Sequence, residues 1–184
     1  MGIILASQSP RRRELLTLAG IEYKVIVSDC DETIKENISP ENAVKTLSER
    51  KAMAVFENNR DAVIIAADTV VAIEDKILGK PKDTEDAINM LKLLSGKKHQ
   101  VSTGVCIISN DKKDTFAVTS QVEFYKLTQR EIEEYVSTGE PMDKAGAYGI
   151  QGKGALLVKG ISGDYFNIVG LPLAETVRHL KAFK

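Results

Sequence analysis

The sequence has little cysteine, no long apolar run and almost no net charge. Its two cysteines among 184 residues are too few for a disulfide scaffold, and they lack the spacing of metal ligands. No segment reaches the roughly 18 apolar residues that a membrane-spanning helix needs. The 25 basic and 26 acidic residues give a formal net charge of −1, so no general attraction to nucleic acid or to an anionic membrane is expected.

Neither the N-terminus nor the cysteines point to secretion or to thiol chemistry. Residues 1–7 lack the basic start and long apolar stretch of a signal peptide, which favours a cytoplasmic location. Cys106 lies in an apolar run and is expected to be a buried small side chain. Cys30 lies between aspartates, whose negative charge disfavours a thiolate. A catalytic cysteine is therefore not expected.

Apolar segments recur along the whole chain, which is 43% hydrophobic, so a disordered chain is excluded. The length predicts one domain over residues 1–184 with a sizeable core. Several expected strands follow one another without a helix between them, which indicates an α/β fold with a mixed sheet. Strands are expected at residues 3–6, 23–27, 61–67, 70–73, 101–108, 116–124, 155–158 and 165–169, the last two as a pair. Helices are expected to begin near residues 10, 40, 84, 128 and 171.

The segment Ser7–Arg13 joins a buried strand to a helix, with Ser9 as the expected N-cap and Pro10 at the first helical position. Free backbone N–H groups at a helix N-terminus favour an anion, and the serines and arginines add donors suited to phosphate. Solvated arginines would be the ordinary alternative, but cations there oppose the helix dipole. A phosphate site is therefore predicted, without the signature of a P-loop.

The next helix has a lysine on its apolar face. Val44, Leu47, Lys51 and Val55 are spaced so that they share one side of the helix. Two interpretations remain open at this point: Lys51 extends its ammonium to the rim of the core, or it directs a cation toward an anionic ligand.

Carboxylates that could take part in catalysis or metal binding occur at two places in the sequence. Asp68 comes after the most apolar strand, at the edge where open α/β sheets place their ligands. Two roles remain open for its carboxylate, general base and metal ligand. An acidic cluster, Asp29, Asp31 and Glu32, lies in an expected loop. One of its carboxylates paired with Asp68 could hold Mg²⁺ against a triphosphate.

A glycine-rich segment, Gly139–Gly152, carries Gln151, whose amide offers a donor and an acceptor suited to the edge of a base. The turn Gly79-Lys80-Pro81 places a lysine after an apolar segment and is by itself a weak signal. His99 and His179 have no nucleophile near them in the sequence and are assigned no role.

Five segments together resemble the Maf family. They occur in the same order as in that family and extend across nearly the whole chain. They are residues 5–16, 67–71, 79–81, 139–152 and 167–172. The resemblance implies nucleoside triphosphate pyrophosphatase activity. It also implies a fold related to the inosine triphosphate pyrophosphatases, an elongated mixed sheet flanked by helices with a cleft between two lobes.

The resemblance also implies roles for individual residues. The family's catalytic proton acceptor matches Asp68. Its polar cleft residues match Ser7, Arg11, Arg12, Glu32, Lys51, Lys80, Lys144 and Gln151. Members that act on dTTP and UTP carry three specificity residues, which here match Arg12, Thr69 and Gln151. The resemblance therefore favours the dTTP and UTP branch over the branch that acts on 7-methyl-GTP.

The expected reaction converts a nucleoside triphosphate and water into the monophosphate and pyrophosphate. A divalent cation, Mg²⁺ or Mn²⁺, would be held by Asp68 and Glu32 with phosphate oxygens. The resemblance also implies a homodimer. The rival interpretation is a nucleotide-binding regulator of cell division with little turnover, in which the same phosphate site would serve binding alone.

Overall fold

The computed structural model describes residues 2–34, 37–74 and 76–183, and its backbone divides into two compact units. Unit 1 comprises residues 1–69, 103–118 and 170–184, and unit 2 comprises residues 70–102 and 119–169. Strands β3, β5 and β6 contribute residues to both units.

The strands form a seven-stranded sheet in the order β2-β1-β3-β5-β6-β7, with β4 paired to β3. Strand β1 runs parallel to β2 and β3, whereas the β3–β4 and β6–β7 pairs are antiparallel. The mixed α/β class expected from the sequence is therefore confirmed. The strands are β1 Gly2–Leu5, β2 Lys24–Val25, β3 Ala62–Ile73, β4 Lys76–Leu78, β5 Lys98–Ile108, β6 Lys113–Phe124 and β7 Val158–Ser162.

The helices follow from local signals that the sequence carries. Ser9 caps a helix as expected, and Ser39 and Thr128 cap the helices expected to begin near residues 40 and 128. Thr128 forms a capping box with Glu131. The α-helices are α1 Pro10–Leu18, α2 Pro40–Phe56, α3 Thr84–Leu94, α4 Gln129–Val136, α5 Tyr165–Val169 and α6 Leu173–Leu180. Short 3₁₀ helices are η1 Glu140–Asp143, η2 Ala145–Ala147, η3 Gly152–Leu157 and η4 Lys181–Phe183. No helix of the described ranges is both long and apolar enough to span a membrane.

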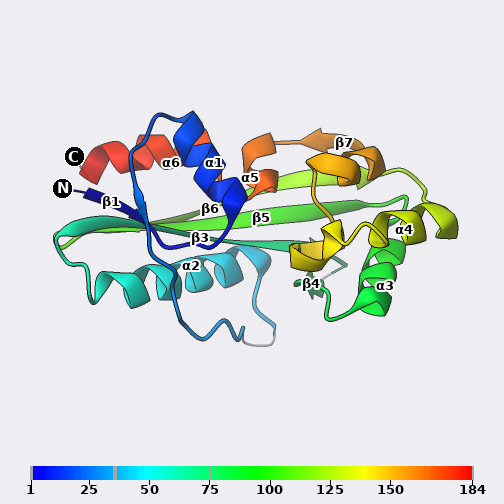
Figure 1. The fold of residues 1–184 in the computed structure, drawn as a ribbon, viewed down its shortest axis with the longest axis horizontal. Helices are drawn as coiled ribbons and strands as arrows, with labels where there is room; N and C mark the ends of the chain where they lie inside the picture. Colours follow the sequence, from blue (N-terminus) through cyan, green and yellow to red (C-terminus); the bar gives the residue numbers. More distant parts are fainter. Residues whose placement is uncertain (1, 35–36, 75, 184) are drawn as a thin grey trace. The chain divides into compact units, whose positions relative to one another are not determined.

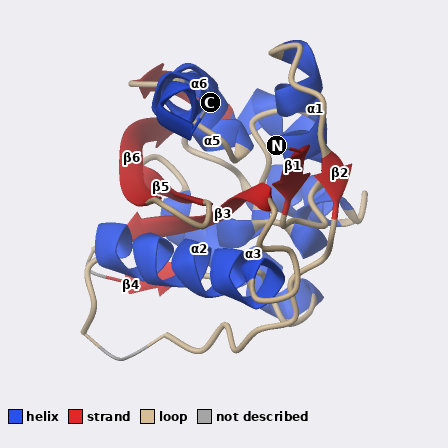
Figure 2. Ribbon diagram, turned by 90° about the vertical axis from the view of Figure 1, so that its left-hand side faces the viewer, coloured by secondary structure: helices blue, strands red, loops and turns tan. Residues whose placement is uncertain are grey.

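In unit 1, α2 covers one face of the strands and α1 and α6 lie on the other (Figures 1 and 2). The buried side chains of α2, among them Ala52 and Val55, pack against apolar residues of β1, β3 and β5. Cys106 lies in this cluster, as expected, and burial raises the pKa of its thiol to about 11. The thiolate that nucleophilic chemistry requires is therefore disfavoured.

A glycine allows α2 to lie very close to the sheet. A Cβ built on Gly104 of β5 would lie 2.4 Å from both the carbonyl carbon and the oxygen of Val44. Backbone cannot move aside as a flexible side chain can, so the separation of α2 and β5 depends on a residue without a Cβ.

In unit 2, α3 and α4 pack on the apolar side chains of the sheet. His99 lies inside this core, where its Nε2 is 2.8 Å from the Tyr148 hydroxyl and its ring meets the edge of Phe124. Burial lowers the pKa of His99 to about 4, so the imidazole is neutral at physiological pH. The structure gives this histidine a packing role.

Two expectations about strands are wrong. Asp68 does not follow the end of a strand, because β3 continues through it from Ala62 to Ile73. The expected strand pair at 155–158 and 165–169 is absent from the described chain: residues 152–157 form η3, residues 158–162 form β7, and 165–169 form α5. The Asp164 carboxylate accepts a hydrogen bond from the N–H of Phe166, a local cap that begins a helix where apolar periodicity had indicated a strand.

Candidate active site

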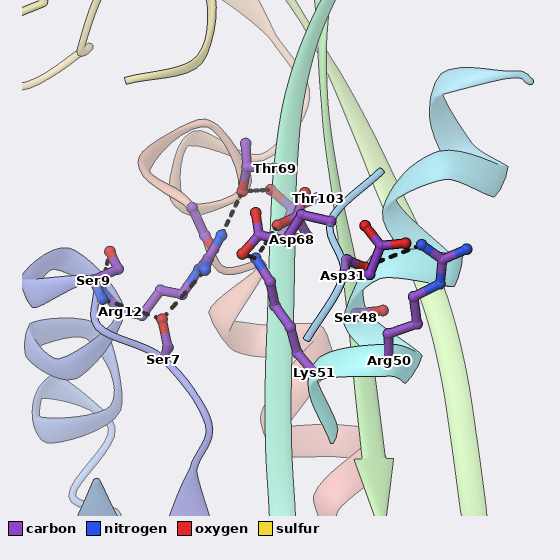
Figure 3. A network of polar contacts seen from close by, with 12 residues as sticks. Ser7, Ser9, Arg12, Asp31, Ser48, Arg50, Lys51, Asp68, Thr69 and Thr103 are labelled. Carbon is purple, nitrogen blue, oxygen red and sulfur yellow. Dashed lines mark hydrogen bonds and ion pairs between the residues drawn. The ribbon is translucent and has the colours of Figure 1, made fainter. Parts of the chain in front are cut away.

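Arg12 lies at the N-terminal turn of α1 and is held in one orientation by three oxygen atoms of unit 1. Its Nε donates to the Gly170 carbonyl at 2.8 Å, its Nη1 to Ser7 Oγ at 3.3 Å and its Nη2 to Thr69 Oγ1 at 3.0 Å. Figure 3 shows the side chain directed from the helix toward Thr69. Oxygen atoms of the chain itself therefore hold the guanidinium in place.

The acceptors of Arg12 in the described hydrogen bonds are all neutral oxygens, so they orient its charge without cancelling it. Burial lowers the pKa of Arg12, the Asp68 charge acts in the opposite direction, and Arg11 beside it lowers the pKa further. A guanidinium stays protonated in proteins. A half-buried cation on neutral partners, next to a helix N-terminus, is suited to bind an anion.

Ser7 and Ser9 shape the turn between β1 and α1. Ser7 Oγ accepts from the N–H of Ser9 at 3.2 Å, and Ser9 Oγ caps the helix by accepting from the N–H of Arg12 at 3.5 Å. Ser7 is buried. The segment predicted as a phosphate site is thus ordered by its own hydroxyls, and Arg12 projects from it.

Lys51 projects inward and pairs with carboxylates of the chain itself, and its role toward an anionic ligand stays a prediction. Its Nζ lies 2.5 Å from Asp68 Oδ1 and 3.1 Å from Glu32 Oε1. The Lys51 and Asp68 side chains are each only 12% exposed. Two carboxylates from separate segments therefore converge on one ammonium, and the predicted proximity of Glu32 and Asp68 is present.

The loop that carries Glu32 is attached to α2 by Arg50, a residue that the sequence did not single out. Arg50 Nη1 donates to the Asp31 carbonyl at 3.1 Å (Figure 3). It also donates to the Thr33 carbonyl at 2.8 Å. Asp31 Oδ1 accepts from the N–H of Thr33, and the hydrogen bonds from Thr33 lower the pKa of Asp31. The two hydrogen bonds of Arg50 join residues 19 and 17 positions apart, so no local pattern pointed to Arg50.

Cys30 lies in the same loop, and the main cause of its raised pKa differs from the one expected from the sequence. The pKa of Cys30 is raised, as expected, but chiefly by burial, whereas the charges of Glu32 and Asp68 contribute less. Lys51 and Arg50 act in the opposite direction. The acidic neighbours are thus a minor cause.

Thr69 extends the network to the next strand. Its Oγ1 lies 2.9 Å from Thr103 Oγ1 on β5 and also accepts from Arg12. Thr103 was not predicted, because it lies in an apolar strand where a threonine is an ordinary β-former. Arg12, Thr69 and Thr103 therefore link α1, β3 and β5 within unit 1.

Among the described residues, no group of three or more histidine, cysteine, aspartate or glutamate side chains could hold a metal ion. The two carboxylates at Lys51 are the acidic groups that this site offers. A cation bound by Asp68 and Glu32 would need its other ligands from a substrate or from water.

The other three predicted residues, Lys80, Lys144 and Gln151, belong to unit 2. Lys80 and Gln151 are exposed. Lys144 Nζ donates to the Glu140 carbonyl at 2.5 Å and to Asp143 Oδ1 at 2.6 Å. The N–H of Gly146 donates to the Gly79 carbonyl, which brings the turn of Lys80 against the glycine-rich segment.

Glu140 is the residue of unit 2 that the sequence interpretation missed. Its carboxylate accepts from the Tyr135 hydroxyl at 3.0 Å and from the backbone of Lys153 and Gly154, both at 3.1 Å. These partners stand up to 14 residues away in the chain, so no local pattern pointed to Glu140. The carboxylate organises the segment that carries Gln151.

The fold and the cluster around Arg12 and Lys51 together define an α/β protein with a site suited to an anionic ligand. The family described as Maf-like protein matches residues 2–183, and the chain belongs to this family.

Similar relatives include bacterial proteins named dTTP/UTP pyrophosphatase. That of Bacillus pumilus (strain SAFR-032) is 57% identical over 98% of this chain and 96% of its own. That of Bacillus velezensis (strain DSM 23117 / BGSC 10A6 / LMG 26770 / FZB42) is 56% identical with the same coverage. Among solved structures, the Ham1 protein of Staphylococcus aureus matches with a TM-score of 0.47 and 18% identity, over 67% of this chain and 72% of that chain.

Proposed function

We propose that this protein is a nucleoside triphosphate pyrophosphatase that hydrolyses dTTP and UTP to the monophosphate and pyrophosphate. The observation that carries the proposal is the identity of 54–57% over 98% of the chain with relatives of that name. The site geometry supports it independently, because a fixed guanidinium, an ammonium and a carboxylate meet in unit 1.

The triphosphate binds at the cationic part of this cluster. Arg12 is held by Ser7, Thr69 and Gly170, so little conformational entropy is lost when it engages a phosphate. Arg11, in the same helical turn, adds a second guanidinium. Phosphoryl transfer needs positioning and charge stabilisation more than covalent chemistry, and these residues supply both.

Asp68 is the proton acceptor. A water molecule attacks the α-phosphorus, a bond forms between its oxygen and that phosphorus, and the bond from the α-phosphorus to the bridging oxygen breaks. The bridging oxygen leaves with pyrophosphate, and the water proton passes to Asp68. Lys51, at 2.5 Å from the Asp68 carboxylate, holds that carboxylate directed into the cluster.

Asp68 and Glu32 would hold the divalent cation, Mg²⁺ or Mn²⁺. Their carboxylates already converge on one positive charge, the Lys51 ammonium, and oxygen donors suit either metal. When bound, the cation would neutralise phosphate charge. The remaining ligands would come from the substrate and water.

Base selectivity is assigned to Gln151 with Thr69 and Arg12, and further phosphate contacts to Lys80 and Lys144. For these assignments the support is the family resemblance and the chemistry of the side chains. The Gln151 amide can donate and accept at a pyrimidine edge. A cytoplasmic location and a homodimer stay predictions.

The test is the hydrolysis of dTTP in water enriched in ¹⁸O, with Mg²⁺ present. Attack at the α-phosphorus places the label in the monophosphate, whereas attack at the β-phosphorus would place it in pyrophosphate. Release of labelled monophosphate and unlabelled pyrophosphate, by mass spectrometry, is expected. Release of orthophosphate, or binding without turnover, would contradict the proposal, and the latter would favour a regulator.

A further inference from the structure

Glu140 lies at the centre of a hydrogen-bond network in unit 2. The proposed reaction does not use this network. Its Oε1 accepts from the Tyr135 hydroxyl and from the N–H of Gly154, and its Oε2 accepts from the N–H of Lys153. The Tyr135 hydroxyl in turn accepts from the N–H of Gly149 at 3.2 Å. Glu140 and Tyr135 therefore hold both ends of the segment 149–154, and Gln151 lies between them.

The glycines of this segment let the backbone approach these two side chains. A Cβ on Gly152, whose φ is +67°, would lie 2.8 Å from Glu140 Oε2. A Cβ on Gly154 would lie 2.1 Å from the Gly149 carbonyl oxygen and 2.7 Å from the Tyr135 hydroxyl. The segment thus wraps a carboxylate and a phenol, with no space for side chains at its glycines.

The charge state of these groups suits the arrangement. Burial raises the pKa of Glu140, but the hydrogen bonds from Gly154, Lys153 and Tyr135 outweigh it, and the pKa is lowered overall. Burial raises the pKa of Tyr135, so its hydroxyl stays a donor. An ionised carboxylate that accepts charge-assisted hydrogen bonds is a stronger anchor than a neutral group.

Glu140 also holds the second predicted substrate residue of this unit. Its main-chain carbonyl accepts from Lys144 Nζ, and the aliphatic part of Lys144 packs where a Cβ on Gly149 would lie, 2.9 Å from Lys144 Cδ. One residue therefore contacts Lys144 through its backbone and the Gln151 segment through its carboxylate.

We propose that Glu140 is a positioning residue for base selectivity, which holds the segment 149–154 so that Gln151 presents its amide in one orientation. This inference rests on the proposed function, because it assumes that Gln151 reads the base. A hydrogen-bonding site discriminates strongly only when its own groups are held in place. Gln151 is exposed and lies in a glycine-rich segment, so the orientation of its backbone depends on Glu140 and Tyr135.

The test compares Glu140→Gln and Tyr135→Phe with the wild type, using dTTP, UTP, CTP and GTP as separate substrates. The Glu140→Gln amide presents N–H donors toward backbone N–H groups, and Tyr135→Phe removes the contacts to Glu140 and Gly149. Each variant is expected to raise the KM for dTTP about tenfold, the effect of one lost charged hydrogen bond, with kcat within about threefold of the wild type. The preference for dTTP over GTP should fall by a similar factor.

Two further measurements separate positioning from general damage. Hydrogen exchange at the amides of Lys153 and Gly154 should become faster in Glu140→Gln while the core of unit 2 stays protected. The matched control is Glu134→Gln, which changes an exposed glutamate of α4 paired with Arg130 and should alter neither KM nor selectivity.

The outcomes distinguish the inference from the function on which it rests. If the wild type releases no pyrophosphate from dTTP, the proposed function fails. If the wild type is active and both variants keep its KM and substrate ranking, the role of Glu140 is overturned. A fall in kcat alone, equal for all substrates, would also overturn it, because positioning of the base should act on KM and selectivity.

Discussion

The ammonium of Lys51 is bonded to the carboxylate of Asp68 across 2.5 Å, from α2 to the middle of β3. Both side chains are nearly buried, and a buried charge is stable only with a partner. This pair explains why a charged residue can lie inside an otherwise apolar strand. It also places the proposed proton acceptor beside a fixed positive charge.

Asp68→Asn tests the proton acceptor. The amide keeps the size of the side chain but is a far weaker base, so kcat for dTTP should fall about 10²-fold or more, while dTTP binding measured by calorimetry largely survives. The control is Asp61→Asn, an exposed residue just before β3, which should keep wild-type kcat. Activity of Asp68→Asn within about threefold of the wild type would remove Asp68 from the mechanism.

Arg12→Ala tests the phosphate contact. Loss of a guanidinium that three oxygens hold in place should raise the KM for dTTP by about tenfold or more. Added salt should weaken wild-type binding more than that of the variant, since the variant has lost one of the charges that salt screens. Arg178→Ala, exposed in α6, is the control. Equal KM values and equal salt dependence for wild type and Arg12→Ala would show that Arg12 does not bind the triphosphate.

Gln151→Glu tests base recognition. The wild type should prefer dTTP and UTP over CTP, ATP, GTP and 7-methyl-GTP, because the amide complements the N3–H and carbonyl of uracil or thymine. The carboxylate cannot donate, so the variant should lose much of this preference. Values of kcat/KM for the six nucleotides give the ranking, and Gln100→Glu on β5, also exposed, is the control. A purine preference in the wild type, or an unchanged ranking in the variant, contradicts the assignment.

Gly104→Ala tests the close packing of α2 on β5. The added methyl group would lie 2.4 Å from the Val44 carbonyl, so α2 must shift, and the free energy of unfolding should fall by about 1–3 kcal/mol or more. Lys51 lies on the same helix, so kcat/KM should fall as well. Urea titration measures the stability. Gly160→Ala, with nothing within 4 Å of its Cβ position, should be nearly neutral, and a Gly104→Ala protein as stable as this control would refute the packing argument.

The lowered pKa of His99 predicts how the free energy of unfolding depends on pH. Its pKa is about 4 in the fold against an ordinary 6.5, so between these values the unfolded chain binds the additional proton. The free energy of unfolding should therefore fall as the pH is lowered through this range, and it should fall less in His99→Gln. Titration of the imidazole by NMR, assigned with His179→Gln, measures the pKa directly. A midpoint near 6.5 would show that burial does not hold His99 neutral.

Much of the local structure could be predicted from the sequence, because the interactions that produce it lie within a few residues of each other. Ser9 and Thr128 cap helices, and the spacing of Val44 and Val55 places Lys51 on the inner face of α2. Caps and helical periodicity are set by neighbours at three or four positions. For this reason the predictions for the starts of α1, α2 and α4 were confirmed.

Prediction from the local sequence failed where the secondary structure of a segment is accompanied by contacts to residues distant in the chain. Strand β3 continues through Asp68, and the partner of this nearly buried carboxylate, Lys51, comes from another element. The helix at Tyr165–Val169 replaced an expected strand, and the buried Asn167 amide bonds the Val101 carbonyl and Ser120 from there. Apolar periodicity over so few residues does not distinguish a strand from a short helix.

By itself, the sequence determined the types of side chain available for the chemistry: arginines at a helix start, one lysine on an apolar face, and a carboxylate within an apolar run. Only the tertiary structure decided which of them meet. Arg12 and its acceptor on Gly170 are 158 positions apart, and Glu140 reaches the backbone of Lys153 and Gly154 across a turn of the chain. Such contacts arise because folding buries polar groups, and each buried group must find a partner wherever the packed chain provides one.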